Sequence, residues 1–410
     1  MYRRRFLEAR LLGPISRNKI RLLFGARQTG KTSLLRHAVV EPPATRFFDL
    51  GDSALRRRFE ADPGAFGREL RALGKHVKNV VVDEIQRVPA LLEEVQAAYD
   101  SAPRRFQFFL TGSSARRLRA RSANLLPGRS HVLHLHPVCR WESERSAGPE
   151  LAPPPGRAAA PERAFPDAPL ERRLRLGSLP GILSEPARTA AATLESYVET
   201  YLEEEIRREA VVRELGPFIV FLRLAAAEAG RQVNVTKLSQ ESGVPASTVS
   251  TYYQALVDTF VGHWIEPYAR PARRRLLTTP RFLFFDLGVR NAAAGASLDA
   301  RITPELGGPL LEQWVTLELL TRASYLGRSH RVSFWRTVTG AEVDLVWEGA
   351  REDVPIEVKW TERPRPEDAR HVEAFLDEHP SRARRGLVVC RCREPQQLTD
   401  RVRAIGWDRL

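Results

Sequence analysis

The segment Gly25-Ala-Arg-Gln-Thr-Gly-Lys-Thr32 constrains this chain most, because it lies between an apolar run, Arg21 to Phe24, and a helix-like run, Ser33 to His37. Glycines in such a loop let the backbone wrap round an anion with its N–H groups pointing inward. Lys31 can then reach the β and γ phosphates, Thr32 can bind Mg²⁺, and the following helix adds the positive end of its dipole. The segment predicts a nucleoside triphosphate site formed by Gly25, Ala26, Arg27, Gln28, Thr29, Gly30, Lys31, Thr32 and Ser33.

The 410 residues suffice for two to four domains. Residues 1–140 alternate short apolar runs with helical stretches, a pattern typical of an α/β domain in which helices cover a parallel sheet. The expected strands are Arg21 to Phe24, Arg46 to Asp49, Val80 to Asp83, Phe106 to Thr111 and His131 to Leu135.

Two of these apolar runs end in polar residues that suit nucleotide hydrolysis. After the run Asn79 to Val82, Asp83 is expected to hold Mg²⁺, usually through water, and Glu84 to polarise the attacking water as general base. The simpler alternative is an acid pair that caps the next helix. After Phe108 to Leu110, Thr111 and Ser113 are equal candidates for a side chain beside the γ-phosphate, and a serine here also suits a helix N-cap.

The chain has 58 Arg and six Lys and a net charge of +14, so a catalytic role is hard to assign to any single arginine. Such a charge favours a polyanionic partner, although the bias can also come from genome composition. Arg129, after the turn Leu126-Pro-Gly128, and the basic run with Arg116, Arg117, Arg119 and Arg121 are candidates to neutralise transition-state charge, in cis or from a neighbouring subunit. No Asn-Lys-x-Asp signature for guanine is present, which favours ATP over GTP.

The remainder of the chain divides by composition. We expect a Pro/Ala-rich loop or linker at 141–169, a helical unit at 170–229, a helix-turn-helix at 230–270 and a small α/β domain at 300–410. Cys139, Cys390 and Cys392 have no paired spacing, so buried free thiols are expected. No apolar stretch is long enough for a membrane span, which predicts a cytoplasmic protein.

Four motifs together resemble a family of prokaryotic AAA-type ATPases: the Gly25 to Thr32 loop, Val82-Asp-Glu-Ile-Gln-Arg-Val-Pro89, Leu110-Thr-Gly-Ser-Ser114 and Pro127-Gly-Arg129. Members carry a carboxy-terminal domain of unknown function, whose marks are Phe285-Asp-Leu-Gly288, Leu311-Glu-Gln-Trp-Val315, Thr339-Gly-Ala-Glu-Val-Asp344 and Pro355-Ile-Glu-Val-Lys359. The resemblance implies an ATPase core with a catalytic glutamate, a helical lid with a winged helix, and a terminal domain resembling restriction endonucleases. The Pro/Ala-rich segment is longer than in that pattern.

The helix-turn-helix at Val233 to Val257 suggests DNA as a partner. Its second helix, from Pro245, would offer Ser247, Thr248, Ser250 and Thr251 to a major groove, and the arginines 270, 273, 274 and 275 would hold the backbone. The alternative is a packing module, because this second helix has no Arg or Lys.

Polar residues of the terminal domain predict a second site. Asp344 lies on one expected strand, and Glu357 and Lys359 share a face of the next because they are two residues apart. The resemblance implies that Asp344, Glu357 and the helical Glu312, with Glu318 as a weaker candidate, hold a divalent ion and that Lys359 assists catalysis. Ordinary surface charge pairs are the alternative.

These features lead to one main hypothesis. We expect a Mg²⁺-dependent ATPase with Lys31, Glu84, Ser113 and Arg129 in catalysis, whose cycle moves a winged helix and a nuclease-like domain on or near DNA. The alternative is a nucleotide-switched protein with slow turnover that binds DNA or another protein and does not cut. A homo-oligomer is compatible with either.

Overall fold

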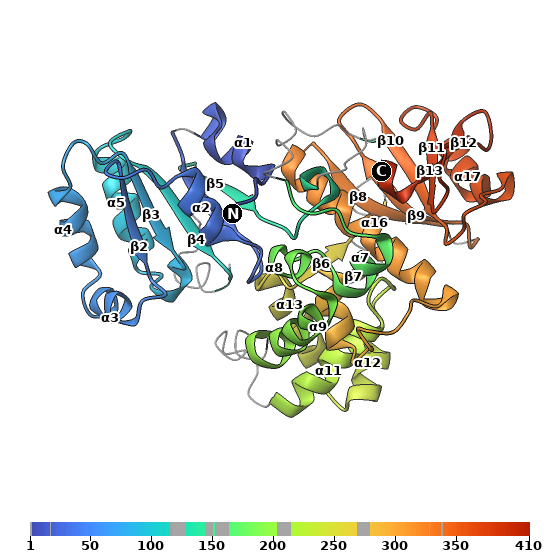
Figure 1. Ribbon diagram of the computed structural model, residues 1–410, viewed down its shortest axis with the longest axis horizontal. Helices are drawn as coiled ribbons and strands as arrows, with labels where there is room; N and C mark the ends of the chain where they lie inside the picture. Colours follow the sequence, from blue (N-terminus) through green and yellow to red (C-terminus); the bar gives the residue numbers. More distant parts are fainter. Residues whose placement is uncertain are drawn as a thin grey trace. The chain divides into compact units, whose positions relative to one another are not determined.

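The computed structural model describes residues 2–16, 18–114, 116, 128–143, 151, 164–202, 215–268, 279–327, 329–337 and 339–410. It forms two compact units (Figure 1). Unit 1 comprises Met1–His136, Ala159–Ala164 and Asp258–Phe260, and unit 2 comprises Pro137–Ala158, Phe165–Val257 and Val261–Leu410. None of the helices in these described ranges combines the length and apolar character that crossing a membrane requires.

Unit 1 contains a five-stranded parallel sheet with the order β2-β3-β4-β1-β5. Its strands are β1 (Ile20–Phe24), β2 (Thr45–Asp49), β3 (Asn79–Asp83), β4 (Gln107–Gly112) and β5 (Ser130–His134). The parallel sheet predicted from the sequence is thus confirmed, with strand limits that differ by one residue at most ends. The sequence does not reveal that β4 lies between β1 and β3, or that β2 lies at the edge.

Successive side chains of each strand point to opposite faces of the sheet, so alternate residues meet the same layer of helices. Leu22, Val80, Val82, Phe108 and Leu110 point to one face and pack in a core with α3 (Ser53–Ala61), α4 (Gly64–Ala72) and α5 (Leu91–Ser101). The other helices in the described part of unit 1 are α1 (Leu7–Leu12) and α2 (Lys31–Ala38), with single turns η1 (Pro14–Ser16) and η2 (Ile85–Arg87).

The first half of unit 2 is helical. It contains η3 (Arg140–Glu142), α7 (Leu170–Leu176), α8 (Pro180–Ser184), α9 (Ala187–Ser196), the π-helical η5 (Tyr197–Leu202), α11 (Leu215–Ala227), α12 (Val235–Ser242) and α13 (Ala246–Asp258). Gly243 ends α12 in the left-handed conformation, so the predicted glycine turn is present between α12 and α13. An antiparallel pair, β6 (Gly262–Ile265) and β7 (Arg281–Phe284), and α15 (Leu287–Ala293) follow.

The Phe285-Asp-Leu-Gly288 motif joins α15 to α7. Asp286 caps α15 by accepting from Gly288 N and Val289 N at 2.9 and 3.2 Å, and it also accepts from Ser178 N at 2.7 Å. Gly177 precedes this contact with φ +72°, and a Cβ there would lie 2.0 Å from Asp286 Oδ1. The motif is therefore explained by close packing of two helix ends rather than by chemistry.

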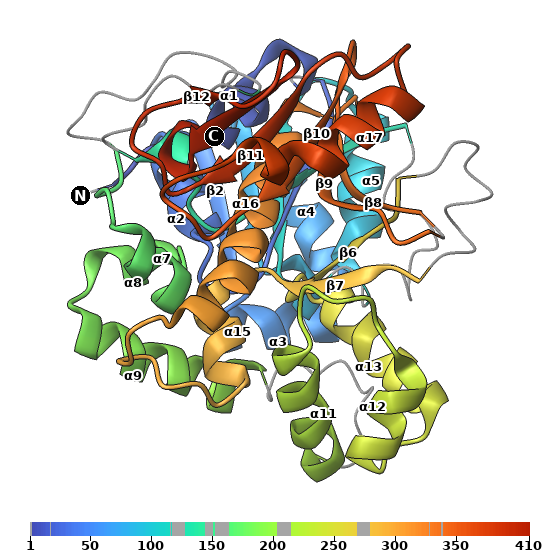
Figure 2. The same cartoon turned by 90° about the vertical axis from the view of Figure 1, so that its right-hand side faces the viewer.

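The second half of unit 2 is a six-stranded sheet with the order β12-β13-β11-β10-β9-β8. Its strands are β8 (Arg331–Arg336), β9 (Glu342–Glu348), β10 (Asp353–Val358), β11 (Gly386–Cys390), β12 (Gln396–Gln397) and β13 (Val402–Gly406). Figure 2 labels β8 to β12 of this sheet. The helix α16 (Pro304–Leu326) packs with Ile356, Leu387 and Val389, whereas α17 (Arg370–Glu378) packs in a separate core with Val388. Alternating residues of β11 thus serve two cores. Short turns η6 (Pro366–Ala369) and η7 (Trp407–Arg409) complete the unit.

All three cysteines are free and buried, as the sequence predicts. Several predicted features fall outside the described residues: arginines 117, 119 and 121, the arginine cluster 270–275, and most of the Pro/Ala-rich segment.

Candidate functional site

The loop between β1 and α2 folds back on its own lysine. Lys31 Nζ donates to the carbonyl oxygens of Gly25 and Ala26 at 2.8 and 2.9 Å, and Thr29 Oγ1 donates to Ala26 O at 2.9 Å. Position 25 has no room for a side chain, since a Cβ there would lie 2.3 Å from Leu135 O. The loop is therefore held compact, with its lysine buried at the carboxyl end of β1.

Asp83, at the end of β3, lies between two hydroxyl groups. Thr32 Oγ1 donates to Asp83 Oδ2 at 2.7 Å, and Thr111 Oγ1 donates to Asp83 Oδ1. Burial raises the pKa of Asp83 above its ordinary value, the two hydroxyl groups oppose that rise, and the nearby Glu84 and Asp49 add to it. A buried carboxylate that is unfavourable to ionise is stabilised when a cation binds beside it. Thr32 and Asp83 are hard oxygen donors within one hydrogen bond of each other, so they fit the Mg²⁺ that accompanies a nucleotide.

Glu84 is held at both its backbone and its side chain. Its backbone is left-handed, with φ +60°, and Glu84 N donates to Thr111 Oγ1 at 3.0 Å. Gln86 Nε2 donates to Glu84 Oε2 at 2.5 Å and to Ser113 Oγ at 2.9 Å. Both β4 candidates therefore join the site: Thr111 contacts Asp83 and Glu84 directly, and Ser113 reaches Glu84 through Gln86.

Two residues of this region have no clear sequence signal. Gln86 follows the acids within the Asp83 to Pro89 string, but nothing in its spacing indicates a contact with Ser113. Arg5 lies far upstream, yet its guanidinium donates to Thr29 O at 2.8 Å and to His136 O at 2.7 Å. The run Arg3-Arg4-Arg5 was its only hint, and a run of arginines is typical of an exposed tail.

Arg129 lies away from the phosphate loop of its own chain. It immediately precedes β5, whose first residue pairs with Ile20 at the amino end of β1, and its Nε donates to Asp100 Oδ1 at 2.6 Å. The loop follows the opposite, carboxyl end of β1. Arg129 and the phosphate loop therefore lie at opposite ends of β1.

In unit 2, the predicted acids are bonded to protein donors. Arg281 Nη1 donates to Glu312 Oε1 at 2.7 Å and to Asp344 O at 3.3 Å, and Nη2 donates to Glu342 Oε1. These contacts bring β7, α16 and β9 together, and the sequence offered no signal for Arg281.

The other predicted residues of this site are bonded within the sheet. Asp344 Oδ2 accepts from Val358 N at 2.8 Å, and Lys359 Nζ donates to Glu357 Oε1 at 2.7 Å. Glu357 and Lys359 therefore meet on one face of β10 and its extension, as their spacing predicts.

Ionisation of the acids in this cluster is unfavourable in the folded protein. Burial raises the pKa of Glu312 to about 8 and that of Glu357 to about 7, with the Asp344 charge adding to both. Burial also raises the pKa of Asp344. Within the described ranges, no group of three or more His, Cys, Asp and Glu side chains is arranged to hold a metal ion. One oxygen of Glu312 accepts from a guanidinium, one of Asp344 from a backbone amide and one of Glu357 from an ammonium, whereas Glu357 Oε2 is buried without a hydrogen-bond partner among the described residues.

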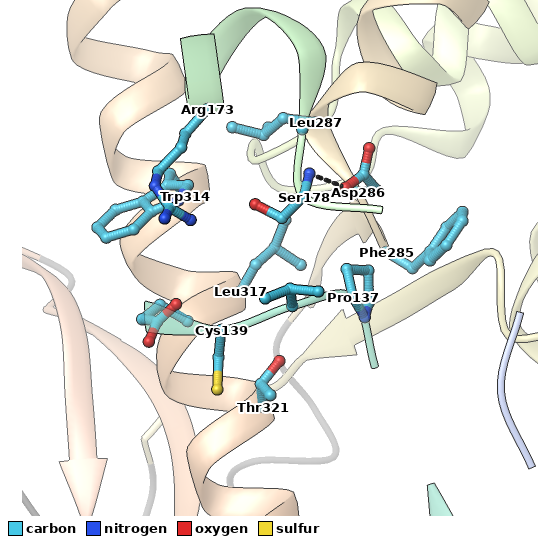
Figure 3. Close-up of a pocket in the computed structure, with 13 residues that line it drawn as sticks. Pro137, Cys139, Arg173, Ser178, Phe285, Asp286, Leu287, Trp314, Leu317 and Thr321 are labelled. Carbon is cyan, nitrogen blue, oxygen red and sulfur yellow. Dashed lines mark hydrogen bonds between the residues drawn. The ribbon is translucent and has the colours of Figure 1, made fainter. Parts of the chain in front are cut away.

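The weaker candidate, Glu318, belongs to a different cluster. Its Oε1 accepts from Arg322 Nη2 at 2.8 Å and from Arg140 N at 2.9 Å. It lines a small hollow of about 30 Å³ with Arg173, Ser178 and Asp286 (Figure 3). This volume suits water rather than a nucleotide or substrate.

Three families match successive parts of the chain. Residues 17–143 match an AAA domain, 168–300 match a domain of unknown function (DUF8612), and 307–410 match a second domain of unknown function (DUF4143). The first match supports an AAA-type ATPase that binds ATP, and the last supports the predicted carboxy-terminal domain of unknown function. A likeness to restriction endonucleases gains no support from these families.

Relatives with curated sequences are themselves uncharacterised. A protein of Mycobacterium bovis and one of Mycobacterium tuberculosis are each 25% identical to this chain over 361 residues, which cover 88% of this chain and 75% of the relative. A crystal structure of a Vibrio cholerae protein covers 95% of this chain and 94% of its own at 11% identity, but its TM-score of 0.17 is too low to support an argument about fold.

Proposed function

We propose that unit 1 hydrolyses ATP with Mg²⁺ and that Glu84 is the general base. The observation that carries this proposal is the continuous set of contacts from Thr32 through Asp83 and Thr111 to Glu84 N. It joins a hydroxyl of the phosphate loop, a buried acid and the following acid at one edge of a parallel sheet.

Each residue has a role that its position allows. Lys31 leaves its two carbonyl partners and binds the β and γ phosphates, and the backbone N–H groups of the loop and of α2 hold the remaining oxygens. Thr32 and Asp83 hold Mg²⁺, which offsets phosphate charge when the nucleotide is bound. Glu84 takes the proton of the attacking water, and Thr111 keeps both acids in place.

The test is phosphate release by the full chain with ATP and Mg²⁺. Lys31→Ala is expected to abolish nucleotide binding, and Glu84→Gln to preserve binding while lowering kcat by about 10²-fold or more. Lys75→Ala, which removes an exposed lysine of the same unit, is the matched control and should retain the wild-type rate. The proposal is contradicted if wild type binds ATP no more tightly than Lys31→Ala does, or if wild type hydrolyses no ATP.

We further propose that the nucleotide cycle acts on DNA through α12 and α13. Support comes from their helix-turn-helix order and from the two-stranded β6-β7 sheet that follows, an order of elements compatible with a winged helix. The absence of Arg and Lys from α13 limits this support. Fluorescence anisotropy of labelled duplex DNA, with and without ATP, tests it: DNA affinity should change with nucleotide and fall steeply as salt is raised.

A second candidate function is a nucleotide-switched binding protein whose terminal acids do not cut. The contact of Arg281 with Glu312 favours it, because the acid is paired with a fixed cation of the same chain. A DNA cleavage assay with Mg²⁺ or Mn²⁺ tests whether the terminal acids cut DNA. Metal-dependent cleavage that Asp344→Ala and Lys359→Ala both remove would establish a nuclease, and equal products from all three proteins would leave the binding function.

A further inference from the structure

The Gln86 side chain connects two elements that carry candidate catalytic residues. It is 4% exposed, in the single turn η2 after β3. Its Nε2 donates both to Glu84 Oε2 and to Ser113 Oγ, just beyond β4. A primary amide nitrogen has two hydrogens, so both bonds can exist together.

The orientation of this amide follows from the chemistry of its partners. A carboxylate can only accept hydrogen bonds, so the nitrogen and not the oxygen of Gln86 must face Glu84. Gln86 Oε1 is buried without a hydrogen-bond partner among the described residues. It lies against Gly112, where a Cβ would come within 3.0 Å of it. The amide thus occupies a narrow place in which one specific orientation is imposed.

The two carboxylate oxygens of Glu84 have different surroundings. Oε2 accepts from Gln86, and Arg87 Nε lies 3.9 Å from the same oxygen. No described residue donates a hydrogen bond to Oε1. One oxygen is therefore anchored, and the other is available to a water molecule.

Ser113 and Thr111 hold Glu84 from the same strand end. They are two residues apart, and Thr111 accepts from Glu84 N whereas Ser113 acts through Gln86. The backbone and the carboxylate of Glu84 are consequently fixed by separate contacts to β4.

From this geometry we propose that Gln86 is a positioning residue for ATP hydrolysis, which anchors the Glu84 carboxylate through Oε2 and ties it to Ser113. The inference rests on the proposed ATPase function. Gln86 itself touches neither nucleotide nor water in this role, so it acts on kcat through Glu84 and leaves nucleotide affinity unchanged.

The test compares steady-state ATP hydrolysis and the Kd for a fluorescent ATP analogue in full-length variants. Gln86→Met keeps the side-chain volume and removes the donors, and it is expected to lower kcat by about 10- to 100-fold with Kd within about twofold of wild type. Gln86→Glu has the same shape without the two donors and should lower kcat at least as far. Gln96→Met, at a glutamine of α5 with no hydrogen bond to the site, is the matched control and should retain kcat.

Double variants separate positioning from a general structural role. If Gln86 acts through Glu84, single-turnover hydrolysis by Glu84→Gln should not fall further when Gln86→Met is added. Adding Ser113→Ala to Gln86→Met should likewise lower kcat little further. A kcat for Gln86→Met within twofold of wild type, a parallel loss of nucleotide affinity, or an undiminished effect in the Glu84→Gln background would overturn the proposal. Failure of the proposed function is distinct: wild type and Glu84→Gln would then release phosphate equally slowly, and both proposals would fall.

Discussion

Asp286 provides a sharp prediction because it is a buried acid whose partners are all backbone N–H groups. It joins α15 to the turn after α7, beside Trp314 and Ser178 in the small hollow (Figure 3). Burial raises its pKa from 3.8 to about 6, although bonds from Ser178, Val289 and Gly288 oppose that rise. The cost of burying the charge therefore outweighs three hydrogen bonds.

The size and sign of the effect follow from proton binding. Between pH 3.8 and about 6 the folded chain keeps a proton on Asp286 that the unfolded chain has lost, so stability falls as pH rises through this window. At ~1.36 kcal/mol per pKa unit, the full change in the free energy of unfolding is about 3 kcal/mol. Between pH 4.5 and 7.5 about 2 kcal/mol of it is accessible, because the unfolded carboxyl is already ionised at pH 4.5.

The assay compares wild type with Asp286→Asn, which keeps an oxygen for the α15 cap and cannot ionise. All seven tryptophans lie after residue 136, so tryptophan fluorescence during urea unfolding reports on unit 2, the unit that contains Asp286. We expect the stability of wild type relative to the variant to fall by about 2 kcal/mol from pH 4.5 to 7.5. A difference that stays constant, or that changes in the opposite direction, would refute the reasoning.

Three further predictions concern other contacts. Gly177→Ala should lower the free energy of unfolding by about 3 kcal/mol or more, since φ +72° and ψ −158° are nearly restricted to glycine and a Cβ there meets Asp286. The control Gly295→Ala, with φ +70° and open space around it, should lower it by about 1–2 kcal/mol. Equal losses in urea unfolding would contradict this prediction. Arg281→Met should lower stability by up to about 3–5 kcal/mol at high pH and less at low pH, where the acids around it take up protons; a pH-independent loss would be inconsistent with burial of charge. Thr111→Val should lower kcat, and it should lower the free energy of unfolding by about 1–3 kcal/mol, because Asp83 and Glu84 N lose their hydrogen-bond partner. Unchanged phosphate release and an unchanged melting temperature would refute this prediction.

Local patterns were sufficient to predict the parallel sheet of unit 1. Its three central strands, β1, β3 and β4, are largely apolar and buried at nearly every position, as is typical of strands covered on both faces. The end of each run also placed Asp83, Thr111 and Lys31 at one edge, because the carboxyl ends of parallel strands meet there. Strand order was not predictable, since the apolar pattern of a run does not depend on which neighbour it pairs with.

The terminal domain shows where such prediction ends. The two-residue spacing of Glu357 and Lys359 predicted that they share a face, where they are bonded to each other. It could not predict Arg281, which reaches Glu312 and Asp344 O from β7 and makes the environment of the acids very different from an empty metal site.

The sequence by itself determined the phosphate loop, the two acids after β3 and the polar end of β4, because each depends on residue types at short, fixed spacing. Only the tertiary structure decided which partners these residues have: Gln86 between Glu84 and Ser113, Asp286 between two helix ends, and Arg281 among the acids of unit 2. Such contacts join segments whose separation along the chain carries no period, and burial then sets the charge and orientation of the side chains that meet there.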